Sequence, residues 1–363
     1  MAAGAPSDGP ERAQDRIVFS VCIPVFNDAT WLPSAIQSVV AQTYADWELV
    51  VSDNCSQDDL ASIVRGFADA RLHYRRWDDH VGTYENHNRA LDMGRSDWIV
   101  PIGADDRLHP AALEAIADTI RELAGRGVRP SMVVGAAARI DEHGMPAERR
   151  YYGSQGAKHV QPGLYDASRW FRVMTSPGAP PWNIGSIAFH RQALVDSGGG
   201  FRPEIGLSAD NELVFRLAAY APVAYVGDVL ADFTVRTDSD GNRRFAANRA
   251  AGDPQTPMGV AMESALRAFE ARGLVRRAER WMLARSLARL HLQRAGQHRI
   301  LHGGRGWRGA LMDVGRALRH WPLLVVSPSS LVRAAGAVLA PAALIRRASA
   351  GLSRAAERGV DAT

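Results

Sequence analysis

The feature that most limits the fold is an alternation of short apolar runs with amphipathic segments over about the first 125 residues. The run at 17–26, IVFSVCIPVF, is typical of a strand that is covered on both faces. After it, Leu32, Ile36 and Val39 recur at helical spacing. Strands and helices that alternate in this way predict an open, mainly parallel sheet with helices on both faces.

The same patterns predict the remaining elements. Further strands are expected at 47–53, 71–77, 97–103, 131–140, 183–190 and 223–236, and a long helix at 209–221. Ser56 would cap the second helix, and Pro110 would open the third. The two cysteines, Cys22 and Cys55, lie in or beside predicted strands, as reduced thiols of a cytoplasmic protein do, and their spacing does not suit a metal site.

Polar side chains follow the ends of the predicted strands. Asn27 comes after the first strand, Asp53 closes the second, and the pair at 105–106 follows the fourth. These residues should meet at one edge, because parallel α/β sheets bind ligands at the carboxyl ends of their strands. No Gly-x-Gly-x-x-Gly sequence follows the first strand, which argues against a dinucleotide site. A rim of carboxylates instead suits a divalent cation that holds phosphate groups.

Six motifs in a fixed order carry a resemblance to a known family. They are PVFN (24–27), VVSDNCSQD (50–58), HVGTYENHN (80–88), GADD (103–106), GSIAFHR (185–191) and SADNELVFRLA (208–218). Over about residues 17–237 the chain resembles the family 2 glycosyltransferases, which are inverting enzymes of the GT-A fold that use nucleotide sugars. The fold class expected is therefore α/β, with a GT-A-type, Rossmann-like mixed sheet that is mainly parallel.

The resemblance assigns roles to individual residues. Phe26 would stack on the nucleobase, Asp53 would accept a hydrogen bond from its ring N–H, and Asp105 would bind the ribose. Asp106 would bind Mg²⁺ or Mn²⁺ between the two phosphates, and Asp210 would deprotonate the acceptor hydroxyl. The further candidates are Pro24, Asn27 and Gly82 for the nucleotide, Trp182 and Asn183 for the acceptor, and Asp238 for the phosphate or metal side.

The sequence departs from the family pattern at three points. Gly103 and Ala104 stand where a leading acid is common, Ala209 replaces a glutamate of the base motif, and Asp238 takes the place of a histidine. The GADD variant is one that the family tolerates.

Each candidate also has a purely structural interpretation. The pair at 105–106, like Asp53, is common in turns, and Asp210 would suit the dipole of a helix that begins there. Trp182 and Asn183 fit either the core or an acceptor pocket, where an aromatic face suits a sugar ring. The position of the candidates at one edge, in the order of the family, favours the functional interpretation.

We therefore expect a metal-dependent, inverting glycosyltransferase that transfers a sugar from a nucleotide sugar to a hydroxyl of a saccharide or lipid-linked saccharide, in cell-surface polysaccharide or glycolipid synthesis. One alternative is a catalytically weak sugar-nucleotide-binding or scaffold protein of the same fold. Another is a nucleotidyltransferase, which would need basic residues in a Gly-rich loop after the first strand. The sequence NDATWLP at 27–33 contains none.

The C-terminal region differs from the rest of the chain in charge. Residues 261–363 contain 18 arginines and six acidic residues, whereas the remainder contains 25 basic and 33 acidic residues. Its most apolar part, 321–345, includes Arg333 and several prolines, which oppose a spanning helix. We expect helices that lie on an anionic membrane and hold a cytoplasmic enzyme at its inner face. A helical subdomain or an oligomer contact is the alternative, and no nucleic-acid-binding motif is present.

These observations suggest a division of the chain. It comprises a leader without regular structure at 1–16, a GT-A domain at 17–237 with a nucleotide-binding half to about 125 and an acceptor half from about 126, a polar linker at 238–258, and a basic helical region at 259–363. The leader contains no apolar run like that of a secretory signal.

Overall fold

The structure is a computed structural model that describes residues 17–146, 160–174, 182–236 and 257–274, with 311 and 314–315. Contacts divide the chain into two units, one of residues 1–203 and 216–236 and the other of 204–215 and 237–363. The domain boundaries suggested by the sequence remain a prediction. In the described part of the chain, no helix combines the length and the apolar character needed to cross a membrane.

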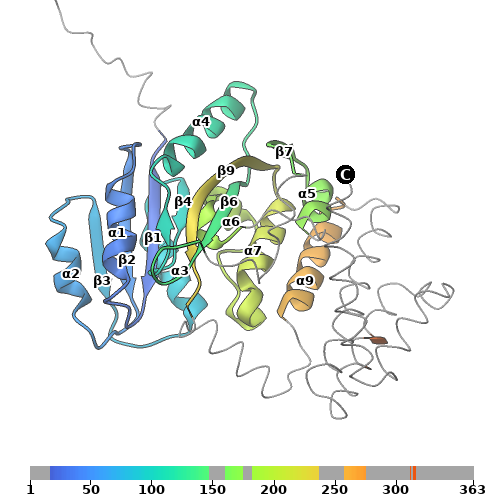
Figure 1. Ribbon diagram of the computed structural model, residues 1–363. Helices are drawn as coiled ribbons and strands as arrows, with labels where there is room; N and C mark the ends of the chain where they lie inside the picture. The colour runs from blue at the N-terminus through green and yellow to red at the C-terminus, as the bar shows by residue number, and fades with distance from the viewer. Residues whose placement is uncertain are drawn as a thin grey trace, which may run out of the picture. The chain divides into compact units, whose positions relative to one another are not determined.

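Nine strands form one sheet in the described residues of the first unit, in the order β3-β2-β1-β4-β8-β6-β9-β5, with β7 paired to β9. They are β1 (Phe19–Val25), β2 (Trp47–Asp53), β3 (Leu72–Arg76), β4 (Trp98–Pro101), β5 (Arg107–Leu108), β6 (Met132–Ile140), β7 (Gly163–Tyr165), β8 (Ile187–His190) and β9 (Val223–Thr234). β1 to β4 are parallel, whereas β8 runs antiparallel to β4 and β6. The mixed, mainly parallel α/β sheet confirms the predicted fold class (Figure 1).

Helices cover both faces of this sheet. On one face, α1 (Leu32–Val40), α2 (Leu60–Gly66) and α4 (Ala112–Gly125) contribute to the same hydrophobic core as Val21 and Ile23 of β1. Successive side chains of a strand point to opposite faces, so Ser20 and Cys22 belong to the other face. There α3 (Thr83–Met93) packs against β1 and β2.

The core follows from the apolar spacing of these helices. Leu32, Ile36 and Val39 of α1 have no exposed surface, as their spacing predicts. Burying an aliphatic side chain of this size contributes about 1.5–3 kcal/mol. A few such residues on each helix are therefore enough to hold it on the sheet.

Two helix starts differ from the prediction. Asp59, and not Ser56, caps α2, because its carboxylate accepts a hydrogen bond from the Ser62 N–H at 3.1 Å. α4 begins after Ala111, beyond Pro110. The preceding residues cannot join that helix, because they form β5, which pairs with β9.

The remaining helices lie between the later strands or belong to the second unit. They are α5 (Ala167–Met174), η3 (Ile184–Ser186), α6 (Arg191–Asp196), η4 (Pro203–Ser208), α7 (Ala209–Ala218) and α9 (Pro257–Ala271). Within the second unit, the Ser264 hydroxyl of α9 donates to Glu212 of α7 at 3.0 Å. Glu212 is fully buried, so this bond satisfies part of a carboxylate that has no contact with water.

Candidate active site

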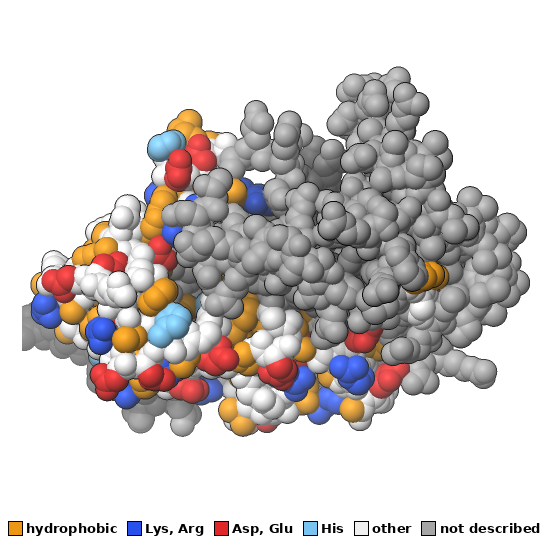
Figure 2. Space-filling model, turned by 90° about the horizontal axis from the view of Figure 1, so that it is seen from below, with side chains coloured by type: hydrophobic (Ala, Val, Ile, Leu, Met, Phe, Trp, Pro, Cys, Tyr) orange, Lys and Arg blue, Asp and Glu red, His pale blue; other side chains and the backbone are white. Residues whose placement is uncertain are grey.

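Hydrogen bonds join the loops that follow β1 and β2. The Asn27 N–H donates to the Ser56 hydroxyl at 3.0 Å, and the Gln57 N–H donates to the Asn27 side-chain oxygen at 2.8 Å. Asn27 has a φ of 51°, in the left-handed region that asparagine tolerates better than most residues. The two loops therefore form one support at the carboxyl edge. Figure 2 views this edge from below and shows charged, histidine and hydrophobic side chains interspersed on its described part.

The rings of Phe26 and His80 form an aromatic pair beside these two loops. Phe26 is 41% exposed, and its ring centroid lies 4.3 Å from that of His80. His80 Nδ1 lies 3.2 Å from the Asn54 carbonyl oxygen, which restrains the imidazole. The pair offers an aromatic surface on which a planar ring can stack. The sequence indicated His80 only as a surface or packing residue, and its place in the loop that follows β3 was the one available signal.

Asp53 lies beneath this pair and has no exposed surface. Its Oδ1 accepts a hydrogen bond from the Ser56 N–H at 2.8 Å, and its Oδ2 accepts one from the Tyr74 hydroxyl at 2.5 Å. Burial, together with the bond to Asp53, raises the pKa of Tyr74 far above its usual range. In the structure Asp53 therefore supports the loop after β2, and its role toward a nucleobase remains a prediction.

Arg236, directly after β9, connects two carboxylates at the edge. Its Nη1 lies 2.8 Å from Asp28 Oδ1 and 3.3 Å from Asp105 Oδ2, and the side chain is 7% exposed. Burial raises the pKa of Asp105, and the Arg236 guanidinium opposes this rise. The arginine therefore favours the ionised form of an aspartate whose protonation burial makes easier.

Asp106 is more deeply buried and is held by two other donors. The Thr234 N–H donates to its Oδ1 at 2.9 Å, and the Asn183 amide donates to its Oδ2 at 3.0 Å. Burial, and next the charge of Asp105, raise the pKa of Asp106 well above its usual range. A Cβ at position 103 would lie 2.9 Å from oxygens of both aspartates, so glycine leaves them the room they need.

Whether this edge of the sheet can bind a divalent cation depends on Asp106. Among the described residues, no ion pair involves this carboxylate, and no group of three or more histidine, cysteine or acidic side chains is arranged to hold a metal ion. Mg²⁺ in phosphate-transfer sites is bound by one or two carboxylates and completes its shell with phosphates and water. Asp106 fits this mode, because a nearby cation would favour its ionised form.

Asp210 belongs to the other unit and opens α7. Its Oδ1 accepts hydrogen bonds from the backbone N–H and the side-chain amide of Asn211, at 2.7 and 2.9 Å. Its role as a general base remains a prediction.

The other predicted residues fall into three groups. Pro24 is buried in β1, and Gly82 caps α3, so both lie at the carboxyl edge. Trp182 is half-buried, next to the Asn183 that binds Asp106. Asp238 lies outside the described residues. The contact between Asn183 and Asp106 was not predicted, since 77 residues separate the two positions in the chain.

The comparisons with known proteins agree with this arrangement. The sequence model described as Glycosyl transferase family 2 matches residues 20–174. An uncharacterized protein of Mycobacterium tuberculosis is 27% identical over 246 residues, which are 66% of this chain and 73% of that protein. The GalNAc(5)-diNAcBac-PP-undecaprenol beta-1,3-glucosyltransferase of Campylobacter jejuni is 32% identical over 106 residues, 28% of this chain and 34% of that enzyme.

Solved structures show the same fold. S. aureus TarS 1–349 has a TM-score of 0.65, with 92% of each chain covered and 16% identity. Its complex with UDP-GlcNAc has a TM-score of 0.55, with 85% of this chain and 92% of that chain covered and 14% identity.

The mixed α/β sheet, which carries paired aspartates at its carboxyl edge, has the GT-A fold. Residues 20–174 match the family 2 glycosyltransferase model, so this part of the chain is a glycosyltransferase domain of that family. The matched part covers about a third of the C. jejuni enzyme and about three quarters of the M. tuberculosis protein.

Proposed function

We propose that the protein transfers a sugar from a nucleotide sugar to a hydroxyl of a saccharide or lipid-linked saccharide, with inversion at the anomeric carbon. The observation that carries this proposal is the pair of adjacent aspartates at the carboxyl edge, half-buried Asp105 and buried Asp106. The complexes of TarS with UDP and UDP-GlcNAc support a nucleotide-sugar donor. The name of the C. jejuni relative supports a lipid-linked acceptor.

The donor nucleotide would bind across the loops after β1 and β2. Phe26 and His80 would stack on the base, since their rings form the exposed aromatic surface there. Asp53 already accepts two hydrogen bonds and would accept a third, from a ring N–H, because each carboxylate oxygen has more than one acceptor site. Asp105 would accept from the ribose hydroxyls, with its charge balanced by Arg236.

Asp106 is the residue that would hold Mg²⁺ or Mn²⁺ beside the donor phosphates. Such a cation stabilises the negative charge of the leaving diphosphate when it is bound. The Thr234 N–H and the Asn183 amide fix both oxygens of Asp106. The carboxylate is therefore oriented before the donor arrives, which lowers the cost of organising the site.

Asp210 would take the proton of the acceptor hydroxyl as that oxygen attacks the anomeric carbon. In this step the new glycosidic C–O bond forms, and the bond from the anomeric carbon to the diphosphate oxygen breaks. The leaving group carries away the electron pair of that bond. A single displacement of this kind inverts the configuration at the anomeric carbon.

We also propose that the basic region at 259–363 holds the enzyme on the inner face of the cytoplasmic membrane. Its excess of arginine supports this role, since each basic residue near an anionic surface contributes about 1 kcal/mol. The full chain should sediment with phosphatidylglycerol vesicles and be released by salt. Replacing Arg276, Arg277 and Arg280 by glutamate should weaken the binding. Failure of the unaltered chain to sediment at low salt would refute the membrane role.

The enzymatic proposal is tested by measuring hydrolysis and transfer over a panel of nucleotide sugars with Mn²⁺. We expect release of a nucleoside diphosphate from one donor, and faster release with a saccharide or lipid-linked acceptor. Binding of donors without turnover would instead identify a sugar-nucleotide-binding or scaffold protein. Release of pyrophosphate from a nucleoside triphosphate and a sugar phosphate would identify a nucleotidyltransferase.

A further inference from the structure

The amino edge of the sheet carries a groove that the proposed reaction does not use. Its volume is about 1020 Å³, and its walls include Trp47 and Glu48 at the start of β2, Arg95 and Trp98 at the approach to β4, and the C-terminal half of α4. β1 has seven residues, and a strand of that length separates the two edges of the sheet by roughly 20 Å. Groups in this groove therefore cannot touch a sugar at the carboxyl edge.

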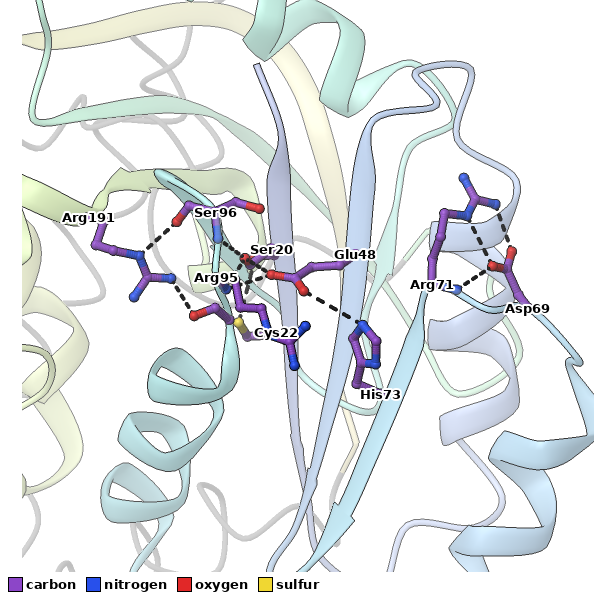
Figure 3. Close-up of polar contacts among 10 residues, drawn as sticks. Ser20, Cys22, Glu48, Asp69, Arg71, His73, Arg95, Ser96 and Arg191 are labelled. Atoms are coloured by element: carbon purple, nitrogen blue, oxygen red, sulfur yellow. Dashed lines mark hydrogen bonds and ion pairs between the residues drawn. The ribbon is translucent and has the colours of Figure 1, made fainter. Parts of the chain in front are cut away.

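One wall of the groove, the loop at 94–96, is braced from two sides (Figure 3). The N–H groups of Arg95 and Ser96 donate to the Ser20 hydroxyl at 3.0 and 2.9 Å, and the Arg95 N–H also donates to Glu48 at 2.6 Å. From the other side, Arg191 donates to the carbonyl oxygens of Ser96 and Gly94, both at 2.8 Å. The Arg95 side chain therefore extends from a rigid backbone.

The groove offers more positive than negative groups to a ligand. Arg95, Arg121 and Arg129 line it, and in the described part of the chain the guanidinium groups of Arg95 and Arg129 make no hydrogen bond or ion pair. Two carboxylates, Glu48 and Asp97, line it as well. That of Glu48 is already engaged by Ser20 and by the Arg95 N–H, so the two guanidinium groups remain against one carboxylate, that of Asp97.

A buried donor on the same wall also lacks an acceptor. Trp47 is 3% exposed, and its indole Nε1 has no hydrogen-bond partner among the described residues. One face of its ring is covered by the Arg71 guanidinium at 3.5 Å. Buried donors without partners are uncommon in folded proteins, because leaving the bond unmade is costly. This N–H has essentially no exposed surface, so it is not among the groups that a ligand in the groove would contact.

We propose that this groove is a second ligand site, which binds a phosphate group through Arg95 and Arg129. A guanidinium group pairs with phosphate oxygens through two parallel hydrogen bonds, and phosphate has enough oxygens for two such groups. Trp98 and Ile120 supply apolar lining, so the ligand is a phosphate ester with an organic part. Its source is either a soluble phosphate ester or the phosphodiester headgroup of a lipid.

Calorimetry of the full chain without divalent cations tests this site. The probes are inorganic phosphate, glycerol 3-phosphate, glycerophosphoglycerol as the soluble headgroup of phosphatidylglycerol, and acetate. We expect Arg95→Gln and Arg129→Gln each to weaken phosphate binding about tenfold or more, as the loss of a charged hydrogen bond does. Arg126→Gln is the matched control, because Arg126 is equally exposed but pairs with Glu122 outside the groove.

The outcomes separate the two sources. Tighter binding of glycerol 3-phosphate identifies a soluble ester, and tighter binding of glycerophosphoglycerol identifies a lipid headgroup. The proposal is overturned if no phosphate probe binds, if acetate binds as tightly, or if the double variant Arg95→Gln/Arg129→Gln binds like the unaltered protein. Binding of UDP with Mn²⁺ should be unchanged in all of these variants, because the donor edge lies at the other end of the strands.

Discussion

At the carboxyl edge of the sheet, Asp28 and Asp105 share Arg236, and Asp106 is held by neutral donors, whereas at the amino edge arginines outnumber carboxylates. Both edges belong to the same sheet, so the difference arises from the residues at the two ends of its strands and in the neighbouring loops and helices. The first edge suits a phosphate that arrives with a cation, and the second suits a phosphate that arrives without one. With both proposed sites, one sheet would hold two phosphate groups through opposite kinds of charge.

The substitution expected to disturb the carboxyl edge most is Asp106→Asn. Loss of the cation should remove several kcal/mol of charge stabilisation in the transition state, which corresponds to a fall in kcat/KM of about a thousandfold. Transfer assays and calorimetry of UDP with and without Mn²⁺ measure this effect. Asp118→Asn, on the exposed surface of α4, is the control. Unchanged metal-dependent affinity in Asp106→Asn would show that the cation binds elsewhere.

The next largest effect concerns the step that follows donor binding. Asp210→Asn should lower kcat by about 10²–10⁴-fold, as removal of a general base does, and leave donor affinity unchanged. Single-turnover transfer together with donor calorimetry separates the two quantities. A variant with nearly normal turnover would identify Asp210 as a residue that only stabilises the start of α7.

Arg236→Ala should lower the free energy of unfolding. Breaking a buried ion pair costs about 3–5 kcal/mol, and the partial exposure of Asp28 and Asp105 reduces this to roughly 2 kcal/mol. Urea denaturation at neutral pH measures the change. Arg121→Ala removes an exposed pair with Asp118 and should cost less than about 1 kcal/mol. Equal costs for the two variants would mean that Arg236 is not the charge that balances the carboxyl edge.

The smallest effect is expected at the amino edge. Burial lowers the pKa of His190 below its ordinary value of 6.5, while Asp97 raises it and Arg129 lowers it further. The neutral His190 side chain therefore contributes its full share of stability above pH 6.5. This share is lost as the pH falls below 6.5 and the imidazole becomes protonated. Arg129→Gln should raise the pKa of His190 toward the ordinary value in an NMR titration. A fall in the pKa of His190 in this variant would show that the charge of Arg129 does not lower that pKa.

The elements with continuous apolar patterns could be predicted from the sequence. β2 has the predicted bounds, and α1 buries the predicted face. α3 was not predicted, because one of its three buried positions is polar and interrupts the apolar pattern: Asn86 is 3% exposed and pairs with Ser52 at 2.8 Å. β5 has two residues and exists only through its pairing with β9, so no local pattern could indicate it.

The candidate site could likewise be predicted only in part from the sequence. The rule that strands deliver ligand-binding residues at their carboxyl ends placed Asp105 and Asp106 at this edge. It could not supply their partners: Arg236 is 131 residues from Asp105 along the chain, and Thr234 is 128 residues from Asp106. Contacts of that separation depend on how β9 joins the sheet, which the sequence of either segment alone does not contain. The chemical roles of these residues remain predictions for the experiments above.

The ends of the sheet also affect how the protein behaves at high concentration. A sheet stops growing where its last strand cannot accept a neighbour, and short or charged edge strands prevent pairing with another molecule. β3, at one end, has five residues and carries the exposed Arg75 and Arg76, and Arg75 lies 3.8 Å from the Trp77 ring. β5, at the other end, has two residues. Neither strand offers a long template for a foreign strand, so pairing between molecules through these two strands is disfavoured.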